Sequence, residues 1–185
     1  MQTVSKSGIP YLPDSDDIGP TDLVKAIRAR RKGKLLNLDR VLLHSPNLAK
    51  GWNSMLAAIR NELSLRPKLR ELAIMAVSSL NGVDYEWIQH EPEFLAAGGR
   101  KEQVAALKNV ATAQKNSKLF DESELATLEL AGEMTKNVQV SPATLKRVRA
   151  VLSDQQTVEL IGTIAGYNMV SRFLIATGIE PEQQR

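Results

Sequence analysis

Apolar residues recur along most of the chain at the spacing of amphipathic helices, and capping or breaking residues separate the segments. Between Pro67 and Gly82, apolar residues recur three or four positions apart, which places them on one helix face. Pro67 suits the first turn of a helix, and Gly82 suits its end. No segment of strand length shows the alternation of a half-buried strand. The pattern therefore predicts an all-α protein with about eight or nine helices.

Local caps give approximate bounds to these helices. Asp121 with Glu124 forms a capping box, and Ser153 with Gln156 can cap a long final helix that stops before Gly178. Thr21, Ser45, Asp84 and Ser141 are the caps predicted elsewhere. The predicted helices cover approximately residues 22–32, 37–44, 46–63, 67–81, 85–97, 101–110, 122–136, 142–152 and 154–177.

The ends of the chain differ in composition from its middle. Residues 1–19 hold two prolines, two glycines and an acidic run, which predicts an extended arm without a core of its own. Ile9, Tyr11, Leu12 and Ile18 are nevertheless apolar, so we expect the arm to lie against the body or a neighbouring subunit. The predicted organisation is an arm (1–19), a single all-α domain (20–178) and a tail (179–185).

Composition narrows the function classes. The 185 residues are 43% hydrophobic and 24% charged with a net charge of +3, which is ordinary for a globular protein. The absence of cysteine excludes disulfides, thiolate metal sites and thiol redox chemistry. The first residues lack the apolar core of a secretory signal, and no window approaches a membrane span. We therefore expect a soluble cytoplasmic protein with no membrane partner.

Residues 85–92 carry the candidate chemistry. Glu86 and His90 are four positions apart, so a helix places them on one face. Pro92 follows, where its missing N–H deprives the carbonyl of Ile88 of its usual helical partner. Glu71, near the start of the preceding helix, has apolar neighbours and should point inward, where it needs a partner or a proton. The tight turn at Gly82 would fold the two helices into an antiparallel hairpin, so that His90 could approach Glu71.

These residues resemble the carboxymuconolactone decarboxylase family, which includes the alkylhydroperoxidase D branch. The likeness rests on residues 69–74, on Tyr85-Glu86-Trp87 with His90, on residues 96–98, and on residues 164–168 with Arg172. It spans about residues 36–177. The resemblance implies an alkylhydroperoxidase D-like helical bundle that assembles as a homotrimer or homohexamer.

The chain departs from the peroxidase branch at the residues that matter most. That branch has a Glu, a Cys-x-x-Cys and a His, which by spacing fall on Glu71, on Val83 and Glu86, and on His90; a second family histidine falls on Tyr85. A thiol peroxidase needs an attacking and a resolving thiol. Neither valine nor glutamate supplies one, so the sequence disfavours an alkylhydroperoxidase or peroxiredoxin-type activity.

The decarboxylase branch does without the cysteine pair, and the resemblance implies a lyase that needs no cofactor. The expected reaction is decarboxylation, or lactone or carbonyl chemistry, on a small organic acid. His90 would move the proton, because its ordinary pKa lies nearest neutrality, and Glu71 or Glu86 would orient it. Arg70 or Arg172 would hold a substrate carboxylate, and Tyr85 and Trp87 would line the pocket.

Two further interpretations remain open at this point. The protein could be a non-enzymatic binding protein that keeps the scaffold with a degenerate site. Alternatively, Glu71, Glu86, His90 and His44 offer donors for a divalent metal, although their spacing is not diagnostic and no metal is predicted.

Two other polar features have simpler interpretations. His44 lies at a predicted helix end, where a histidine often meets the terminal carbonyls. Six cations within ten positions lack the aromatic interleaving of a nucleic-acid site, so we expect a solvated or subunit-contacting face and no nucleic-acid partner. These are Lys25, Arg28, Arg30, Arg31, Lys32 and Lys34.

Overall fold

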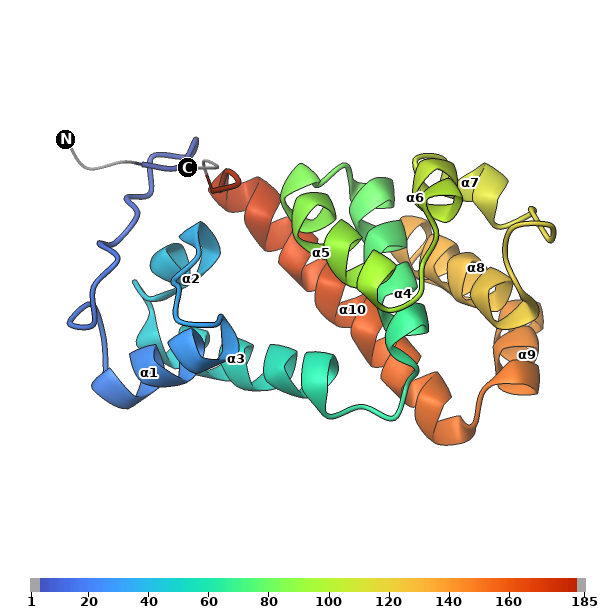
Figure 1. The fold of residues 1–185 in the computed structure, drawn as a ribbon, viewed down its shortest axis with the longest axis horizontal. Coiled ribbons are helices and arrows are strands. Elements are labelled where there is room, and N and C mark those ends of the chain that lie inside the picture. The colour runs from blue at the N-terminus through green and yellow to red at the C-terminus, as the bar shows by residue number, and fades with distance from the viewer. Residues whose placement is uncertain (1–3, 183–185) are drawn as a thin grey trace. The chain divides into compact units, whose positions relative to one another are not determined.

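The computed structural model describes residues 4–182, and every regular element in that range is an α-helix (Figure 1). A single isolated bridge pairs Val4 with Pro10. The helices are α1 (Thr21–Arg30), α2 (Asn37–Leu42), α3 (Pro46–Asn61), α4 (Pro67–Asn81), α5 (Asp84–Ala96), α6 (Lys101–Leu107), α7 (Val110–Ala113), α8 (Glu122–Lys136), α9 (Pro142–Val151) and α10 (Asp154–Thr177).

The all-α prediction is confirmed, but the predicted number of helices was too low. Residues 4–182 hold ten helices, because the segment predicted as one helix over residues 101–110 ends at Leu107 and a separate short helix begins at Val110. The side chain of Asn109 accepts a hydrogen bond from the backbone N–H of Thr112 and so caps this short helix. Four residues are too few for the helical period to show in the sequence.

The described chain forms two compact units. One consists of the described parts of residues 1–62 and 173–185, and the other consists of residues 63–172. Helix α10 contributes to both, with residues 154–172 in the second unit. These bounds differ from those of the predicted arm, domain and tail, whose organisation stays a prediction.

In the second unit, α4 supplies much of the core. Every residue from Glu71 to Ser78 is buried, and both α5 and α8 pack against this helix. Leu72, Ile74 and Met75 are fully buried. Burial of each such side chain contributes about 1.5–3 kcal/mol. A buried carboxylate in this helix therefore lies in an environment that is otherwise apolar.

A tight turn joins α4 to α5. Gly82 adopts a left-handed conformation with φ of 67°, which a residue with a Cβ adopts at an energetic cost. The hydroxyl of Ser78 donates to the carbonyl of Val83 at 2.8 Å and holds the turn in place. The predicted cap at Asp84 was wrong, because Val83 occupies the cap position and Asp84 is the first helical residue. Its carboxylate instead lies in the first turn, where it opposes the positive end of the helix dipole.

Side-chain caps begin the later helices as predicted. Asp121 accepts from the N–H of Glu124 at 2.9 Å, and Glu124 accepts in return from the N–H of Asp121 at 2.9 Å. Ser153 and Gln156 exchange equivalent bonds at the start of α10. These reciprocal bonds satisfy N–H groups that a helix leaves without partners.

In the first unit, the N-terminal residues lie against the C-terminal segment and α2. Tyr11 is buried and accepts from the N–H of Glu180, and the N–H of Lys6 donates to the carbonyl of Gly178 at 3.0 Å. His44 was predicted to meet the carbonyls that end its own helix. That prediction was wrong, because its Nε2 forms a 2.7 Å hydrogen bond with the carbonyl of Pro10.

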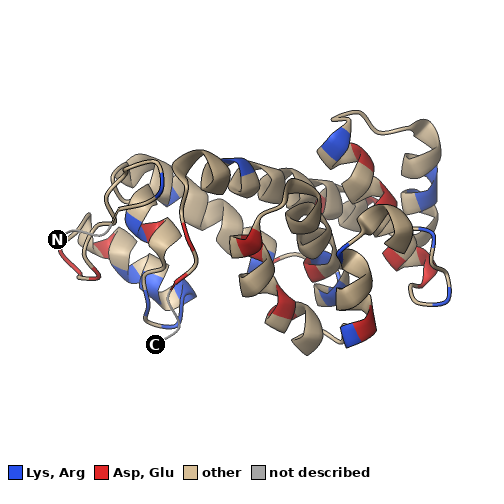
Figure 2. Ribbon diagram, turned by 90° about the horizontal axis from the view of Figure 1, so that it is seen from above, with Lys and Arg blue, Asp and Glu red and all other residues tan. Residues whose placement is uncertain are grey.

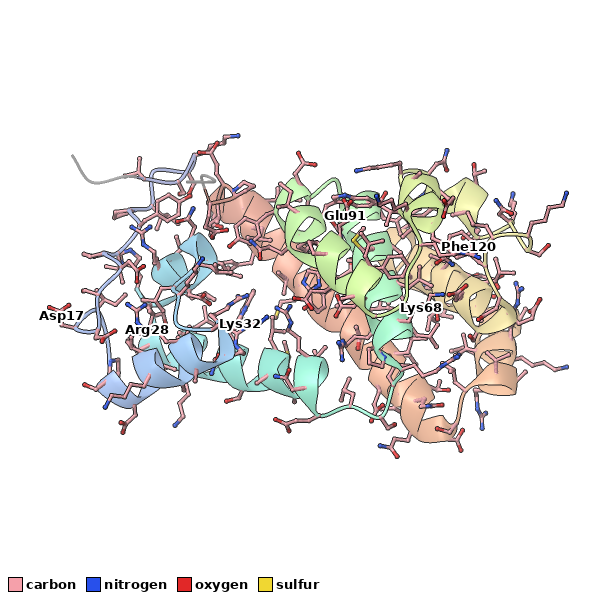
Figure 3. The ribbon with its side chains drawn as sticks, viewed as in Figure 1. Asp17, Arg28, Lys32, Lys68, Glu91 and Phe120 are labelled. Atoms are coloured by element: carbon pink, nitrogen blue, oxygen red, sulfur yellow. The ribbon has the colours of Figure 1, made fainter. Side chains whose placement is uncertain are left out.

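Three arginines of the basic cluster form ion pairs, and basic and acidic positions adjoin one another in this part of the ribbon (Figure 2). Arg28, labelled in Figure 3, binds Asp14 at 2.7 Å and Asp16 at 2.6 Å. Arg30 and Arg31 both approach Asp39, and their side chains are only 7% and 11% exposed. Of the predicted solvated or subunit-contacting face, the solvated alternative was therefore wrong for Arg30 and Arg31, and contact with another subunit stays a prediction.

No helix within residues 4–182 combines the length and the apolar character that crossing a membrane requires.

Candidate active site

The centre of the candidate site is a hydrogen bond between Glu71 of α4 and His90 of α5. Nδ1 of His90 lies 2.7 Å from Oε2 of Glu71, although the residues are 19 positions apart in sequence. Both side chains are buried, with residue exposures of 1% for Glu71 and 4% for His90. The hairpin brings them together as its spacing predicted.

Arg70 is a second cationic partner of Glu71. Its Nε donates to Oε1 of Glu71 at 3.0 Å, and its side chain is 16% exposed. Glu71 therefore receives hydrogen bonds on both oxygens from groups that carry or can carry positive charge. Arg70 thus binds a carboxylate of the protein itself through Nε, and its role in holding a substrate carboxylate stays a prediction.

These contacts keep Glu71 ionised. Burial raises the pKa of the carboxyl, but the hydrogen bond and charge of His90, together with Arg70, outweigh burial and hold the pKa of Glu71 below its ordinary value. An ionised carboxylate only accepts, so Nδ1 of His90 carries a hydrogen. The exchangeable proton of the ring is therefore the one on Nε2, which is the arrangement that a histidine acid or base requires.

Glu86 lies one turn before His90 on α5 and has a different environment. It is 2% exposed, and its Oε2 forms a hydrogen bond with the hydroxyl of Ser171 on α10. Within residues 4–182, Oε1 of Glu86 is buried without a hydrogen-bond partner, and no cation forms an ion pair with the carboxyl. Burial raises the pKa of Glu86 to about 8, against a smaller opposing effect of Ser171. Glu86 is thus predominantly a neutral carboxylic acid at pH 7.

Ser171 and Tyr167 are site residues that sequence reasoning did not single out. The ring of Tyr167 meets the ring of His90 edge-on, with centroids 5.0 Å apart and planes at 89°. Tyr167 and Ser171 are four residues apart on α10, as Glu86 and His90 are on α5. Their spacing of four residues indicated that Tyr167 and Ser171 share one face of a helix. It did not indicate that this face of α10 packs against α5.

The remaining predicted residues lie on α5 and α10. Tyr85 and Trp87 are largely buried, with Trp87 donating from Nε1 to Glu91 at 2.8 Å (Glu91 is labelled in Figure 3). The Nζ of Lys108 lies 3.5 Å from the centre of the Trp87 ring. Arg172 is exposed at the residue level and donates to the carbonyl and side chain of Asn168. Roles for Tyr85, Trp87 and Arg172 in substrate binding stay predictions.

Comparison with known protein families identifies the central part of the chain. The model of the carboxymuconolactone decarboxylase family matches residues 46–127. This segment is similar to that family. The match includes α3 to α7 and the start of α8, and hence Glu71, Glu86 and His90, whereas Tyr167 and Ser171 lie beyond it. The matched segment is shorter than the range of 36–177 that the sequence resemblance suggested.

Solved structures extend the likeness to the full fold. An uncharacterized peroxidase-related protein from Silicibacter sp. TM1040 has a TM-score of 0.79 and 20% identity, covering 99% of this chain and 96% of that one. A second peroxidase-related protein, an alkylhydroperoxidase AhpD core from Ralstonia eutropha JMP134, has a TM-score of 0.80 and 17% identity, with coverages of 99% and 95%. These likenesses show an alkylhydroperoxidase D-like fold.

A third similar structure is a debrominase. Bmp8, solved as a cysteine-to-alanine variant with 2,3,4-tribromopyrrole, has a TM-score of 0.77 and 18% identity, covering 94% of this chain and 91% of that one. No curated protein matches the sequence. The present chain has no cysteine anywhere, with Val83 and Glu86 at the positions expected for the thiols of the peroxidase branch.

Proposed function

We propose that this protein is an enzyme that uses acid–base groups, without a cofactor, to decarboxylate a small organic acid or to act on a related lactone or carbonyl compound. The observation that carries the proposal is the buried 2.7 Å contact between His90 Nδ1 and Glu71 Oε2. The family of residues 46–127 supports the reaction class.

Each residue has a defined role in the proposed reaction. Glu71 fixes the ring of His90 and stabilises its protonated form, so that Nε2 can give or take a proton. In a decarboxylation, the carbon–carbon bond to the departing carboxylate breaks and carbon dioxide leaves. The electron pair stays on the remaining carbon, and Nε2–H of His90 donates its proton to that carbon. Glu86, neutral near pH 7, is a second acid on the same helix face.

The experiment that tests this function is a screen of lactones and 3-oxo acids with the native protein and two histidine variants. His90→Ala should abolish turnover, because it removes the proton-transferring nitrogen. His44→Ala is the matched control, since it deletes the other histidine, which is exposed and bonded to Pro10. Circular dichroism and light scattering should show that fold and assembly persist in both variants. Full activity of His90→Ala would remove this residue from the mechanism.

The burial of the site favours a second candidate function, a binding protein in which the polar pair is structural. Glu71, Glu86 and His90 are exposed by 1%, 2% and 4%, respectively. Diethylpyrocarbonate modification distinguishes the two candidates. An enzyme must admit small molecules to His90, so slow but measurable modification of His90 supports catalysis, and complete protection while His44 reacts supports the structural role.

The comparisons also name peroxidase-related proteins, but the cysteine-free chain lacks the groups for a thiol mechanism. Hydroperoxide consumption that depends on an added thiol reductant would contradict this conclusion.

We further expect the enzyme to be a cytoplasmic homotrimer or homohexamer.

A further inference from the structure

The pairing of Glu86 with Ser171 has a chemistry of its own. Glu86 comes from α5 and Ser171 from α10, 85 positions later, and both side chains are almost completely buried. A carboxyl group removed from water and without a neighbouring cation is more stable when it keeps its proton. The two oxygens of that carboxyl then differ, because one carries the proton and the other accepts.

The contacts distinguish these oxygens. Ser171 meets Oε2, whereas Oε1 has no hydrogen-bond partner within residues 4–182. If the serine hydroxyl donates to Oε2, the carboxyl proton resides on Oε1. If the carboxyl donates to the serine instead, the proton resides on Oε2 and is engaged in the hydrogen bond to Ser171.

We propose that Ser171 is a positioning residue that donates to Oε2 of Glu86 and thereby keeps the acidic proton on Oε1, where it can be given to an oxygen of the substrate. This inference rests on the function proposed above. It implies that the substrate group next to Oε1 of Glu86 is a neutral hydrogen-bond acceptor, such as the carbonyl oxygen of a lactone or ketone. An anionic carboxylate there would be poorly matched, because within residues 4–182 no cation forms an ion pair with the Glu86 carboxyl.

Three further ionisable groups, on α4, α5 and α10, have contacts of their own. On α4, Glu71 binds both His90 and Arg70, so its negative charge is compensated. On α5, His90 lies one turn from Glu86 and faces both Glu71 and Tyr167. On α10, Arg172 is held by Asn168. Ser171 is thus the group in direct hydrogen-bonded contact with the Glu86 carboxyl.

The direction of the hydrogen bond determines the sign of a measurable shift. A serine that donates to the carboxyl stabilises the ionised form, so its removal raises the pKa of Glu86 further. A serine that accepts from the carboxyl stabilises the neutral form, so its removal lowers that pKa. The burial of Glu86 alone predicts no dependence on Ser171.

The experiment is an NMR titration of protein labelled with ¹³C at the glutamate side-chain carboxyl. The signal of Glu86 is identified by its absence from Glu86→Gln. We expect its midpoint near pH 8 in the native protein and at higher pH in Ser171→Ala. Ser171→Thr, which restores a hydroxyl, should return the midpoint toward the native value.

Thr163→Ala is the matched control. It also deletes a buried hydroxyl on α10, but that hydroxyl bonds to the carbonyl of Glu159, so the midpoint of Glu86 should not change. A lower or unchanged midpoint in Ser171→Ala, or a native Glu86 that titrates near its ordinary value, would overturn the proposal. The titration needs no substrate, so its result is independent of whether His90→Ala loses turnover.

Discussion

Two carboxyl groups on the α4–α5 hairpin have opposite protonation states because their partners differ. Glu71 is surrounded by hydrogen-bond donors from His90 and Arg70, and its pKa lies below the ordinary value even though burial acts against this. Within residues 4–182, Glu86 has only the hydroxyl of Ser171 as a hydrogen-bond partner, so burial prevails and raises its pKa to about 8. Such a pair, one ionised and one neutral at the same pH, can act as an orienting base and an acid within one site.

The raised pKa of Glu86 predicts how stability depends on pH. The unfolded chain loses this proton near pH 4.5 and the folded protein near pH 8. Between these values the folded state binds more protons, so the contribution of Glu86 falls as pH rises, by about 1.4 kcal/mol per pH unit. Below the lower value, both states are protonated and the contribution is constant.

Glu86→Gln removes this dependence because glutamine does not titrate. The free energy of unfolding of the variant, relative to the native protein, should increase between pH 5 and pH 8. Urea unfolding at several pH values measures the difference. A difference that is the same at both ends of the range would show that Glu86 ionises normally in the folded state.

At the scale of the helices, the position of a glycine determines whether its replacement by alanine raises or lowers the stability of the fold. Gly82 ends α4 with φ of 67°, whereas Gly162 lies inside α10 and has open space where a Cβ would lie. Alanine is strained in the first conformation and favoured in the second. The same chemical change should therefore have opposite effects at the two sites.

Gly82→Ala should destabilise the protein by roughly 1 kcal/mol, and Gly162→Ala should stabilise it by up to about 1 kcal/mol. Thermal and urea unfolding of the two variants provide the comparison. Equal effects of the same sign would mean that the turn between α4 and α5 does not depend on the left-handed conformation of Gly82.

The bounds of α4, α8 and α10 were predictable because their caps and end signals are local in sequence. The Glu71–His90 contact was also accessible, since the spacing of the hairpin and the family resemblance both pointed to it. Ser171 was not, because a residue 85 positions from Glu86 becomes its partner only through tertiary packing. The ion pairs of Arg30 and Arg31 with Asp39 were missed for the same kind of reason, because a sequence shows which residues are charged but not which of them lie together in the folded protein.

For the molecule as a whole, self-association is the expected behaviour. Apolar side chains remain exposed on the second unit at Ile88, Val158 and Met169, with exposures of 48%, 69% and 39%. Apolar side chains favour association between proteins where they form a contiguous patch. Light scattering should give a mass three or six times that of the chain, and Val158→Glu should weaken the assembly. A native protein that is monomeric at all concentrations would contradict this expectation.

The proposed mechanism depends on Glu71 and His90 acting together as a proton-transferring pair. The most direct test measures kcat for the native enzyme, His90→Ala, Glu71→Gln and the double variant on a substrate from the screen. We predict that each single substitution lowers kcat by about 10²–10⁴-fold, and that the double variant is no slower than the slower single one, because residues that act as a unit have non-additive effects. Single variants that keep native kcat, or losses that multiply in the double variant, would contradict the pair mechanism.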